Sequence, residues 1–364
     1  WPGWGSAFAV KTWIRHAEDA AMTLQATVSM SWVNTVLDEA ARQGVAREAL
    51  LAQAGIAPEE LRQERWPIDH ITRLWRAAVR ATQDAGFGLK AGSQVGPANF
   101  NVVGELLQTS ASLREAIAAV QKYQRLISDG GRFQMVAGAQ ASWLIYHPRQ
   151  GTLAFSPHQV EAVLAAVLSF IGGAMGAVVR PLRVQFSQPR VGLLAGYREV
   201  FACPVAFEQA FSGLLLDNAL LDAPLLRADQ RRAREHQRAA AARMAELTQG
   251  GALAQELRAW MIATLASRVP TRAEAAQALG VSERTLARRM QAQGLSFTAL
   301  LDGVRRDAAL QAVTDSTRAL ADIGLALGFA EPAVFWRAFR RWTGCTPQAW
   351  RDSPGDTGKP GNRS

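Results

Sequence analysis

Two segments in the last third of the chain carry the same pattern. Residues 275–290 and 323–339 each contain a helical stretch that ends in Leu-Gly, a short turn, and a second helical stretch with arginine on its outer face. This pattern predicts a helix-turn-helix, a motif whose second helix enters the major groove of DNA. One copy alone is also compatible with an ordinary helical hairpin, but tandem copies with matching arginines favour DNA binding.

The positive charge of the chain is concentrated around this repeat. The 364 residues carry a net charge of +9, of which +1 falls in residues 1–226 and +8 in residues 227–364. A chain of this length suggests two domains. A basic segment beside a neutral one is typical of a DNA-binding module joined to a domain with another task. The alternative is a well-solvated arginine-rich surface, which the repeated motif makes the weaker interpretation.

The N-terminal half has mixed periodicity, which predicts an α+β domain that is helix-rich with a small sheet. We expect helices over residues 31–41, 47–54, 69–84 and 112–127, and strands over 132–136, 141–147, 182–186 and 214–218. The first two strands are expected to form a hairpin. The C-terminal domain is predicted to be all-α, with the two helix-turn-helix units.

Composition and periodicity divide the chain into five segments. We expect a poorly structured extension over residues 1–30, a ligand-sensing and dimerisation domain over 31–226, a linker helix over 227–251, the tandem helix-turn-helix domain over 252–352, and a disordered tail over 353–364. The linker is rich in alanine and arginine without an apolar stripe, as in an exposed helix, and Gly250-Gly251 is expected to break it.

Residues 163–179 are nearly all apolar and reach the lower length limit for a membrane span. They are rich in alanine and glycine and stand alone, so a buried central helix is the better interpretation, and we expect no membrane partner. Cys203 and Cys345 lie in different halves, which favours neither a disulfide framework nor a zinc site. With no signal-peptide pattern, we expect a cytoplasmic, nucleoid-associated protein.

In the first copy, Gly280 is placed to end the positioning helix and Ser282 to cap the second helix. Arg284 and Arg288 are four residues apart and share a face, where arginine can bind guanine bidentately or contact phosphate. Ser282 and Thr285 lie in the first turn, where hydroxyls and free backbone N–H groups suit phosphate.

The second copy places Arg337 where the first has Arg288, with Trp336 beside it to contact a thymine methyl or a sugar. Arg340 and Arg341 follow at the far end of the helix and suit phosphate. Between the copies, residues 295–313 predict one long helix that would hold the recognition helices about 34 Å, one DNA turn, apart. The residues that we expect to contact DNA are therefore Ser282, Arg284, Thr285, Arg288, Trp336, Arg337 and Arg340.

Residues 252–351 resemble the DNA-binding domain of the AraC/XylS family of bacterial transcription regulators. The most specific stretch, residues 327–351, contains Gly328-Phe329, Arg337-Ala338-Phe339-Arg340, Gly344-Cys345-Thr346-Pro347 and a closing Arg351. Residues 104–116 and 196–207 are similar to the branch with an "arabinose-binding domain of AraC type", found in ornithine-utilisation-like regulators. Gly324 replaces a usual alanine, which is expected to loosen its helix. Residues 330–333 are less polar than is usual, so we expect the first copy to supply more of the base reading.

The resemblance implies a transcription regulator controlled by a small-molecule effector of unknown identity, a homodimer that acts with RNA polymerase on promoter or operator DNA. Candidate effector contacts, which combine apolar walls with polar tips, are Trp75, Tyr123, Arg125, Trp143, Tyr146 and His158. The residues suggest no cofactor, no metal site and no catalytic constellation, so we do not expect an enzyme. Two alternatives stay open: a ligand-independent dimeric regulator, and an enzyme with a DNA-targeting tail.

Overall fold

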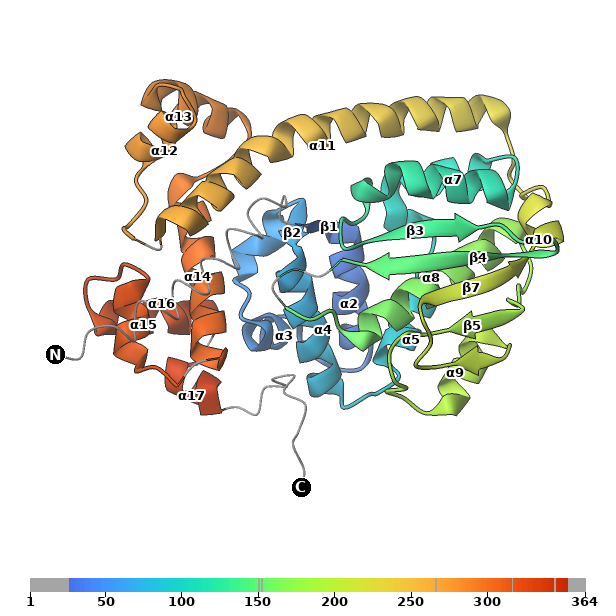
Figure 1. Cartoon of the computed structure of the whole chain (residues 1–364), viewed down its shortest axis with the longest axis horizontal. Coiled ribbons are helices and arrows are strands. Elements are labelled where there is room, and N and C mark those ends of the chain that lie inside the picture. Colours follow the sequence, from blue (N-terminus) through green and yellow to red (C-terminus); the bar gives the residue numbers. More distant parts are fainter. Residues whose placement is uncertain are drawn as a thin grey trace. The chain divides into compact units, whose positions relative to one another are not determined.

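The computed structural model describes residues 26–352 except Gln150, Thr152, Ala266, Ser316 and Gly344. These residues form two compact units, the first over residues 26–54 and 58–245 and the second over residues 55–57 and from residue 246 onward. Figure 1 labels their elements along the chain. The tail expected over 353–364 and most of the extension expected over 1–30 lie outside the described residues.

The described end of the extension is ordered, so the prediction of poor structure is wrong there. Strand β1 (Thr27–Ser29) pairs antiparallel with β2 (Arg65–Pro67). The Arg65 guanidinium donates to Thr27 Oγ1 at 2.9 Å and to the Thr27 carbonyl at 3.1 Å. The ordering comes from a partner segment distant in sequence, which local composition does not reveal.

The first unit is helix-rich, and the predicted helices are confirmed as α2, α3, α4 and α7. Its α-helices are α2 (Met30–Arg42), α3 (Arg47–Ala54), α4 (Ile68–Thr82), α5 (Phe87–Ser93), α6 (Asn101–Thr109), α7 (Leu113–Tyr123), α8 (Pro157–Met175), α9 (Leu194–Phe201) and α10 (Asn218–Asp222). Short 3₁₀ turns are η1 (Pro58–Arg62), η2 (Pro97–Phe100) and η3 (Gln124–Leu126). Helix α7 begins at a cap, because Ser112 Oγ accepts from the Glu115 N–H.

A five-stranded sheet has the order β3-β4-β7-β5-β6. Its strands are β3 (Gly131–Val136), β4 (Ala141–Pro148), β5 (Arg183–Gln185), β6 (Val205–Ala206) and β7 (Ser212–Asp217). The predicted hairpin is confirmed as the antiparallel pair β3–β4, and the other two predicted strands are β5 and β7. The sequence missed β6, a two-residue parallel partner of β5 that is too short to show a period.

Helix α8 is the apolar segment of the sequence and the central core helix of the first unit. By length and composition it is the one described helix apolar enough to cross a membrane, but 61% of its most apolar window is buried within the protein. Gly88 and Gly92 of α5 face it, and a Cβ at either position would collide with the His158 or Ala162 carbonyl. The glycines therefore permit the close contact between α5 and α8.

Helix α11 (Gln230–Leu265) continues through Gly250 and Gly251, so the predicted break is wrong. A glycine in a helix interior costs about 1 kcal/mol relative to alanine. In a 36-residue helix rich in alanine, leucine, arginine and glutamate, two such costs are offset by strong helix formers and by buried positions such as Leu257 and Met261. Most of its N-terminal half is exposed, as the sequence predicts.

The remaining helices of the second unit confirm the all-α prediction. They are α12 (Arg272–Ala278), α13 (Glu283–Ala292), α14 (Phe297–Asp315), α15 (Leu320–Ala326), α16 (Pro332–Thr343) and α17 (Pro347–Asp352). One core cluster includes Leu286 and Met290, and another includes Phe335 and Phe339. Trp260, Phe297 and Leu300 pack against both clusters, so α11 and α14 join the two helix-turn-helix units.

Candidate nucleic-acid interface

The two predicted units have the same turn. In the first, the N–H groups of Leu279, Gly280 and Val281 donate to the carbonyls of Ala275, Gln277 and Ala276. In the second, every one of these donors and acceptors recurs 48 residues later, from Leu327, Gly328 and Phe329 to Ile323, Leu325 and Gly324. Gly280 and Gly328 have φ angles of +65° and +74°, the left-handed conformation that closes such a turn.

The second helix of the first unit, α13, starts at the predicted cap. Ser282 Oγ accepts from the Thr285 N–H at 3.2 Å and lies 2.9 Å from the Thr285 hydroxyl. Leu286 and Met290 are buried beneath the helix. Both hydroxyls therefore stand at the N-terminus of α13, the end of a helix that favours anions.

Arg284 and Arg288 lie on the side of α13 opposite its buried residues. Both side chains are exposed, and neither forms an ion pair or hydrogen bond with any residue that the structure describes. Arg289, off this face, is also exposed and unpaired among the described residues. Arg272, by contrast, pairs with Glu283 at 2.8 Å. The outward guanidiniums of α13 are thus free for an external acceptor.

The corresponding helix of the second unit, α16, starts 49 residues after α13, so its turn is one residue longer. Arg337 and Arg340 are exposed and unpaired among the described residues, and Trp336 is 51% exposed. Arg341, which the sequence assigned to phosphate, instead donates to both carboxylate oxygens of Asp302 at 2.8 and 2.9 Å. That ion pair ties α16 to α14 and engages the guanidinium, and a phosphate contact by Arg341 stays a prediction.

Two features hold the second unit together. Arg305 of α14 donates to the Leu327 and Gly328 carbonyls at 3.0 and 3.1 Å, and its guanidinium lies over the Phe329 ring. Burial lowers the pKa of Arg305. A Cβ at Gly324 would lie 2.8 Å from Phe335 Cβ, so the glycine allows close packing. The close packing gives Gly324 a structural role, and its effect on the stability of α15 stays a prediction.

Gln291 is a further candidate that was not among the residues predicted to contact DNA. It is exposed on α13, three residues after Arg288, and its position corresponds to Arg340 at the offset of 49 residues. The same helical spacing that selected the arginines could have identified it. A glutamine on this face can bind adenine bidentately.

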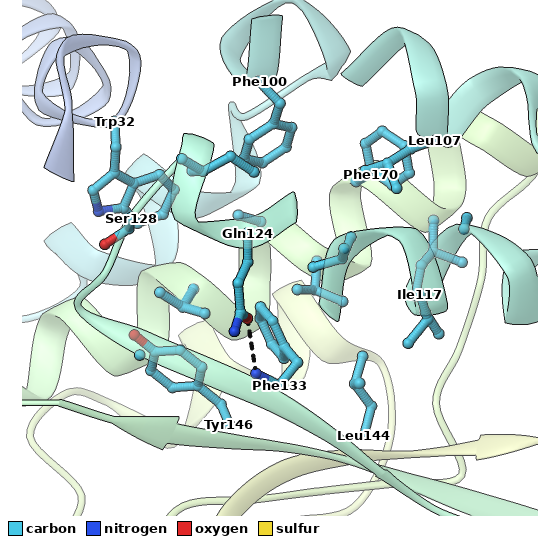
Figure 2. A pocket seen from close by; sticks show the side chains of 18 of the residues that line it. Trp32, Phe100, Leu107, Ile117, Gln124, Ser128, Phe133, Leu144, Tyr146 and Phe170 are labelled. Carbon is cyan, nitrogen blue, oxygen red and sulfur yellow. Dashed lines mark hydrogen bonds between the residues drawn. The ribbon is translucent and has the colours of Figure 1, made fainter. Parts of the chain in front are cut away.

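The candidate effector contacts do not come together. A cavity of about 110 Å³ lies between α7, α8 and the β3–β4 hairpin, and of the six candidates only Tyr146 lines it (Figure 2). Trp75 packs on Phe87, Tyr123 reaches the Gln237 carbonyl, Arg125 pairs with Asp129, Trp143 packs on Phe211, and His158 pairs with Glu161. In the described part of the chain, no group of three or more His, Cys, Asp or Glu residues is arranged to hold a metal ion.

Two family models match the chain. Residues 44–225 match "Arabinose-binding domain of AraC transcription regulator, N-term", and residues 275–353 match "Helix-turn-helix domain". Together with the paired units, these matches define a DNA-binding transcription regulator with a separate N-terminal domain. The chain belongs to the AraC family of transcription regulators.

Relatives with known names are also regulators. The ornithine utilization regulator of Pseudomonas aeruginosa is 27% identical over 329 residues, which cover 90% of this chain and 97% of the relative. The HTH-type transcriptional regulator VirS of Mycobacterium tuberculosis is 25% identical over 291 residues, or 79% of this chain and 84% of VirS. The crystal structure of the transcriptional regulator CdpR from Pseudomonas aeruginosa has a TM-score of 0.44 and 21% identity, covering 87% of this chain and 96% of that chain.

Proposed function

We propose that α13 and α16 enter two successive major grooves of a promoter or operator and bind it sequence-specifically. The observation that supports this most is the outward row of unpaired side chains on each helix, Arg284 and Arg288 on α13, and Arg337 and Arg340 on α16. Arginine on a helix in the major groove can bind guanine bidentately. Unpaired guanidiniums need not break an internal ion pair to do so.

The two helices divide the task unequally. Arg284, Arg288 and the added candidate Gln291 contact base edges, while Ser282 and Thr285 contact phosphate at the start of α13. On α16, the position that corresponds to Arg284 is Ala333. Arg337 and Arg340 therefore supply anchoring, and Trp336 adds a contact to a thymine methyl or a sugar.

Fluorescence anisotropy with promoter fragments at fixed salt tests this division. Arg288→Ala is expected to weaken specific binding by about 5- to 150-fold, because one bidentate arginine–guanine pair contributes about 1–3 kcal/mol of discrimination. Preference for the specific fragment over a scrambled one should fall with it. Arg340→Ala should weaken both fragments alike and lower the salt dependence by about one phosphate contact.

Arg231→Ala is the matched control, because Arg231 is an exposed arginine at the start of α11, outside both helix-turn-helix units. It should leave affinity and preference unchanged. Unaltered sequence preference in Arg288→Ala would show that α13 does not contact bases through this residue.

The N-terminal domain gives the regulator its control in this proposal. It binds a small-molecule effector and dimerises, and effector binding changes DNA affinity because the effector favours one state of the protein over another. The family match of this domain and its cavity support the effector. The protein acts with RNA polymerase at the cytoplasmic nucleoid, as a regulator rather than an enzyme.

One relative is named for ornithine utilization, but the cavity does not favour that ligand here. Ornithine carries two ammonium groups and a carboxylate, and no Asp, Glu, Lys, Arg or His lines the cavity. A buried charge without a partner is strongly unfavourable. We infer that an effector bound in this cavity is neutral.

A further inference from the structure

The cavity between α7, α8 and the β3–β4 hairpin is lined mainly by hydrocarbon. Its walls come from α7, α8, η2, η3 and the β3–β4 hairpin, and aromatic rings stand around it, notably Phe100, Phe133, Tyr146 and Phe170 (Figure 2). Phe100 packs edge-on against Phe170, and Phe133 packs against Tyr146. These rings could form stacked or edge-to-face contacts with an aromatic ring of a ligand.

The polar groups of the lining are few, and most are already engaged. Gln124 Oε1 accepts from the Phe133 N–H at 3.1 Å, the bond drawn in Figure 2. The Tyr146 hydroxyl donates to the Gly130 carbonyl at 3.2 Å, and Ser128 Oγ accepts from the Gly130 N–H at 2.9 Å. The tyrosine hydroxyl therefore needs no ligand to satisfy its donor.

Gln159 of α8 differs from these groups. It is one of the residues that line the cavity, it is only 2% exposed, and its buried Oε1 has no hydrogen-bond partner among the described residues. A buried amide without a hydrogen-bond partner is unfavourable. Such a group therefore indicates that a ligand supplies the missing hydrogen bond. An amide has both hydrogen-bond donors and an acceptor, and a hydroxyl group can donate and accept as well. A hydroxyl is therefore a suitable partner for the Gln159 amide.

The volume limits the size of the occupant. An apolar cavity of about 150 Å³ holds benzene. The cavity here measures about 110 Å³, which leaves space for one ring with small side-chain adjustments. A second ring or a long acyl chain would have to extend out of the cavity.

We propose that this cavity binds a small neutral phenol, its ring among the aromatic side chains and its hydroxyl hydrogen-bonded to the Gln159 amide. The assignment rests on the proposed effector control and names the chemical class of that effector. The phenol O–H donates to Gln159 Oε1, which satisfies the unpartnered oxygen. No ionised group is required on either side.

Fluorine NMR of the full chain tests the assignment with matched probes. 4-Fluorophenol should bind, and should bind about fivefold more tightly than fluorobenzene, as expected for one net hydrogen bond. 4-Fluorobenzoate and ornithine should not compete. Competition by 1-hexanol as strong as that by phenol would overturn the preference for a ring, and tighter binding of the benzoate or of ornithine would overturn the proposal as a whole.

Variants locate the site. Gln159→Met keeps the volume but removes the amide, so the preference for fluorophenol over fluorobenzene should disappear while both still bind. Gln185→Met is the matched control, because Gln185 is a buried glutamine on β5 that does not line the cavity. Its preference should stay near fivefold. An unchanged preference in Gln159→Met would overturn the role of the amide.

A cavity-filling variant gives a second test. Ala166→Leu places three more carbons into the cavity wall and should abolish binding of both probes; retained binding would overturn the location. Anisotropy on the promoter fragment with and without 4-fluorophenol addresses control separately. Binding of the phenol with no change in DNA affinity would support the cavity assignment and contradict effector control, whereas absent binding with intact DNA affinity would overturn only the assignment.

Discussion

The two helix-turn-helix units share their turn hydrogen bonds but differ in the side chains around them. The first packs Ala276 and Leu286 in its core, and the second has Gly324 and Phe335 at the corresponding positions. A larger side chain on one helix thus accompanies a smaller residue on the other. One backbone motif can therefore be stabilised by different packing, and each unit should respond differently to the same substitution.

Replacing the turn glycine by alanine should give the largest difference in stability loss between the two helix-turn-helix units. Gly328→Ala adds left-handed strain and a collision with Val269 Cγ2, for an expected cost of about 2–5 kcal/mol. Gly280→Ala adds the strain alone, because nothing lies within 4 Å of its Cβ, and should cost about 1–2 kcal/mol. Hydrogen exchange of α12, α13, α15 and α16 in the full chain measures both. Equal losses would contradict the packing difference.

The core pair that differs between the units should show strong energetic coupling, so that substitutions at Gly324 and Phe335 do not act independently. Gly324→Ala brings a Cβ within 2.8 Å of Phe335 Cβ and should destabilise α15 and α16 by about 1–3 kcal/mol. Phe335→Leu, which recreates the Ala–Leu pair of the first unit, should recover part of that loss in the double variant. Ala276→Gly in the first unit is the control, with a cost of about 1 kcal/mol from helix propensity. Additive effects of the two changes would argue against compensation.

The first helices of the units differ in capping. Thr271 and Glu274 form a reciprocal capping box at α12, whereas Ala319 offers α15 no side-chain cap. Thr271→Ala should cost about 1 kcal/mol, and Ala319→Ser should stabilise α15 by about 0.5–1 kcal/mol. Exchange rates of the first-turn amides of each helix measure this. If Ala319→Ser left the exchange rates unchanged, water would already satisfy those amides equally well.

The smallest expected difference is a response to acid. Hydrogen bonds from Thr271 and then Arg268 lower the pKa of Glu274 below its usual 4.5. The ionised group therefore stabilises α12 above that value, and the stabilisation is lost as the pH falls below it towards the lowered pKa. Exchange of α12 amides between about pH 6 and 3 should show this loss, and Glu274→Gln should flatten it. A pH profile that Glu274→Gln leaves unchanged would assign the acid response to another group.

Much of this molecule could be predicted because its signals are local. Helical spacing identified most of the long helices, and the offset between repeats identified both turns. Ser282 was expected as a cap from its type and place, and it is one. The outward position of Arg284 and Arg288 followed from a spacing of four residues. Gln291 could have been added in the same way, because it lies three residues after Arg288 on the same helix.

The effector cavity could not be predicted in this way. Its walls come from segments as far apart as Trp32 and Phe170, and only Tyr146 was among the candidates. Aromatic side chains with polar tips are common in cores, so residue type did not separate Tyr146 from Trp75 or Trp143. What distinguishes Gln159 is an absent partner, and that becomes visible only when the surrounding chain is in place.

The sequence by itself determined the tandem repeat, the caps, the basic C-terminal segment and the class of regulator, since each depends on residues near one another in the chain. Tertiary structure decided which arginines remain available: Asp302 engages Arg341 from 39 residues away, and Arg337 is left unpaired among the described residues. It also carried α11 through Gly250 and Gly251. These outcomes depend on contacts between residues that are far apart in the chain, and local sequence patterns do not reveal such contacts.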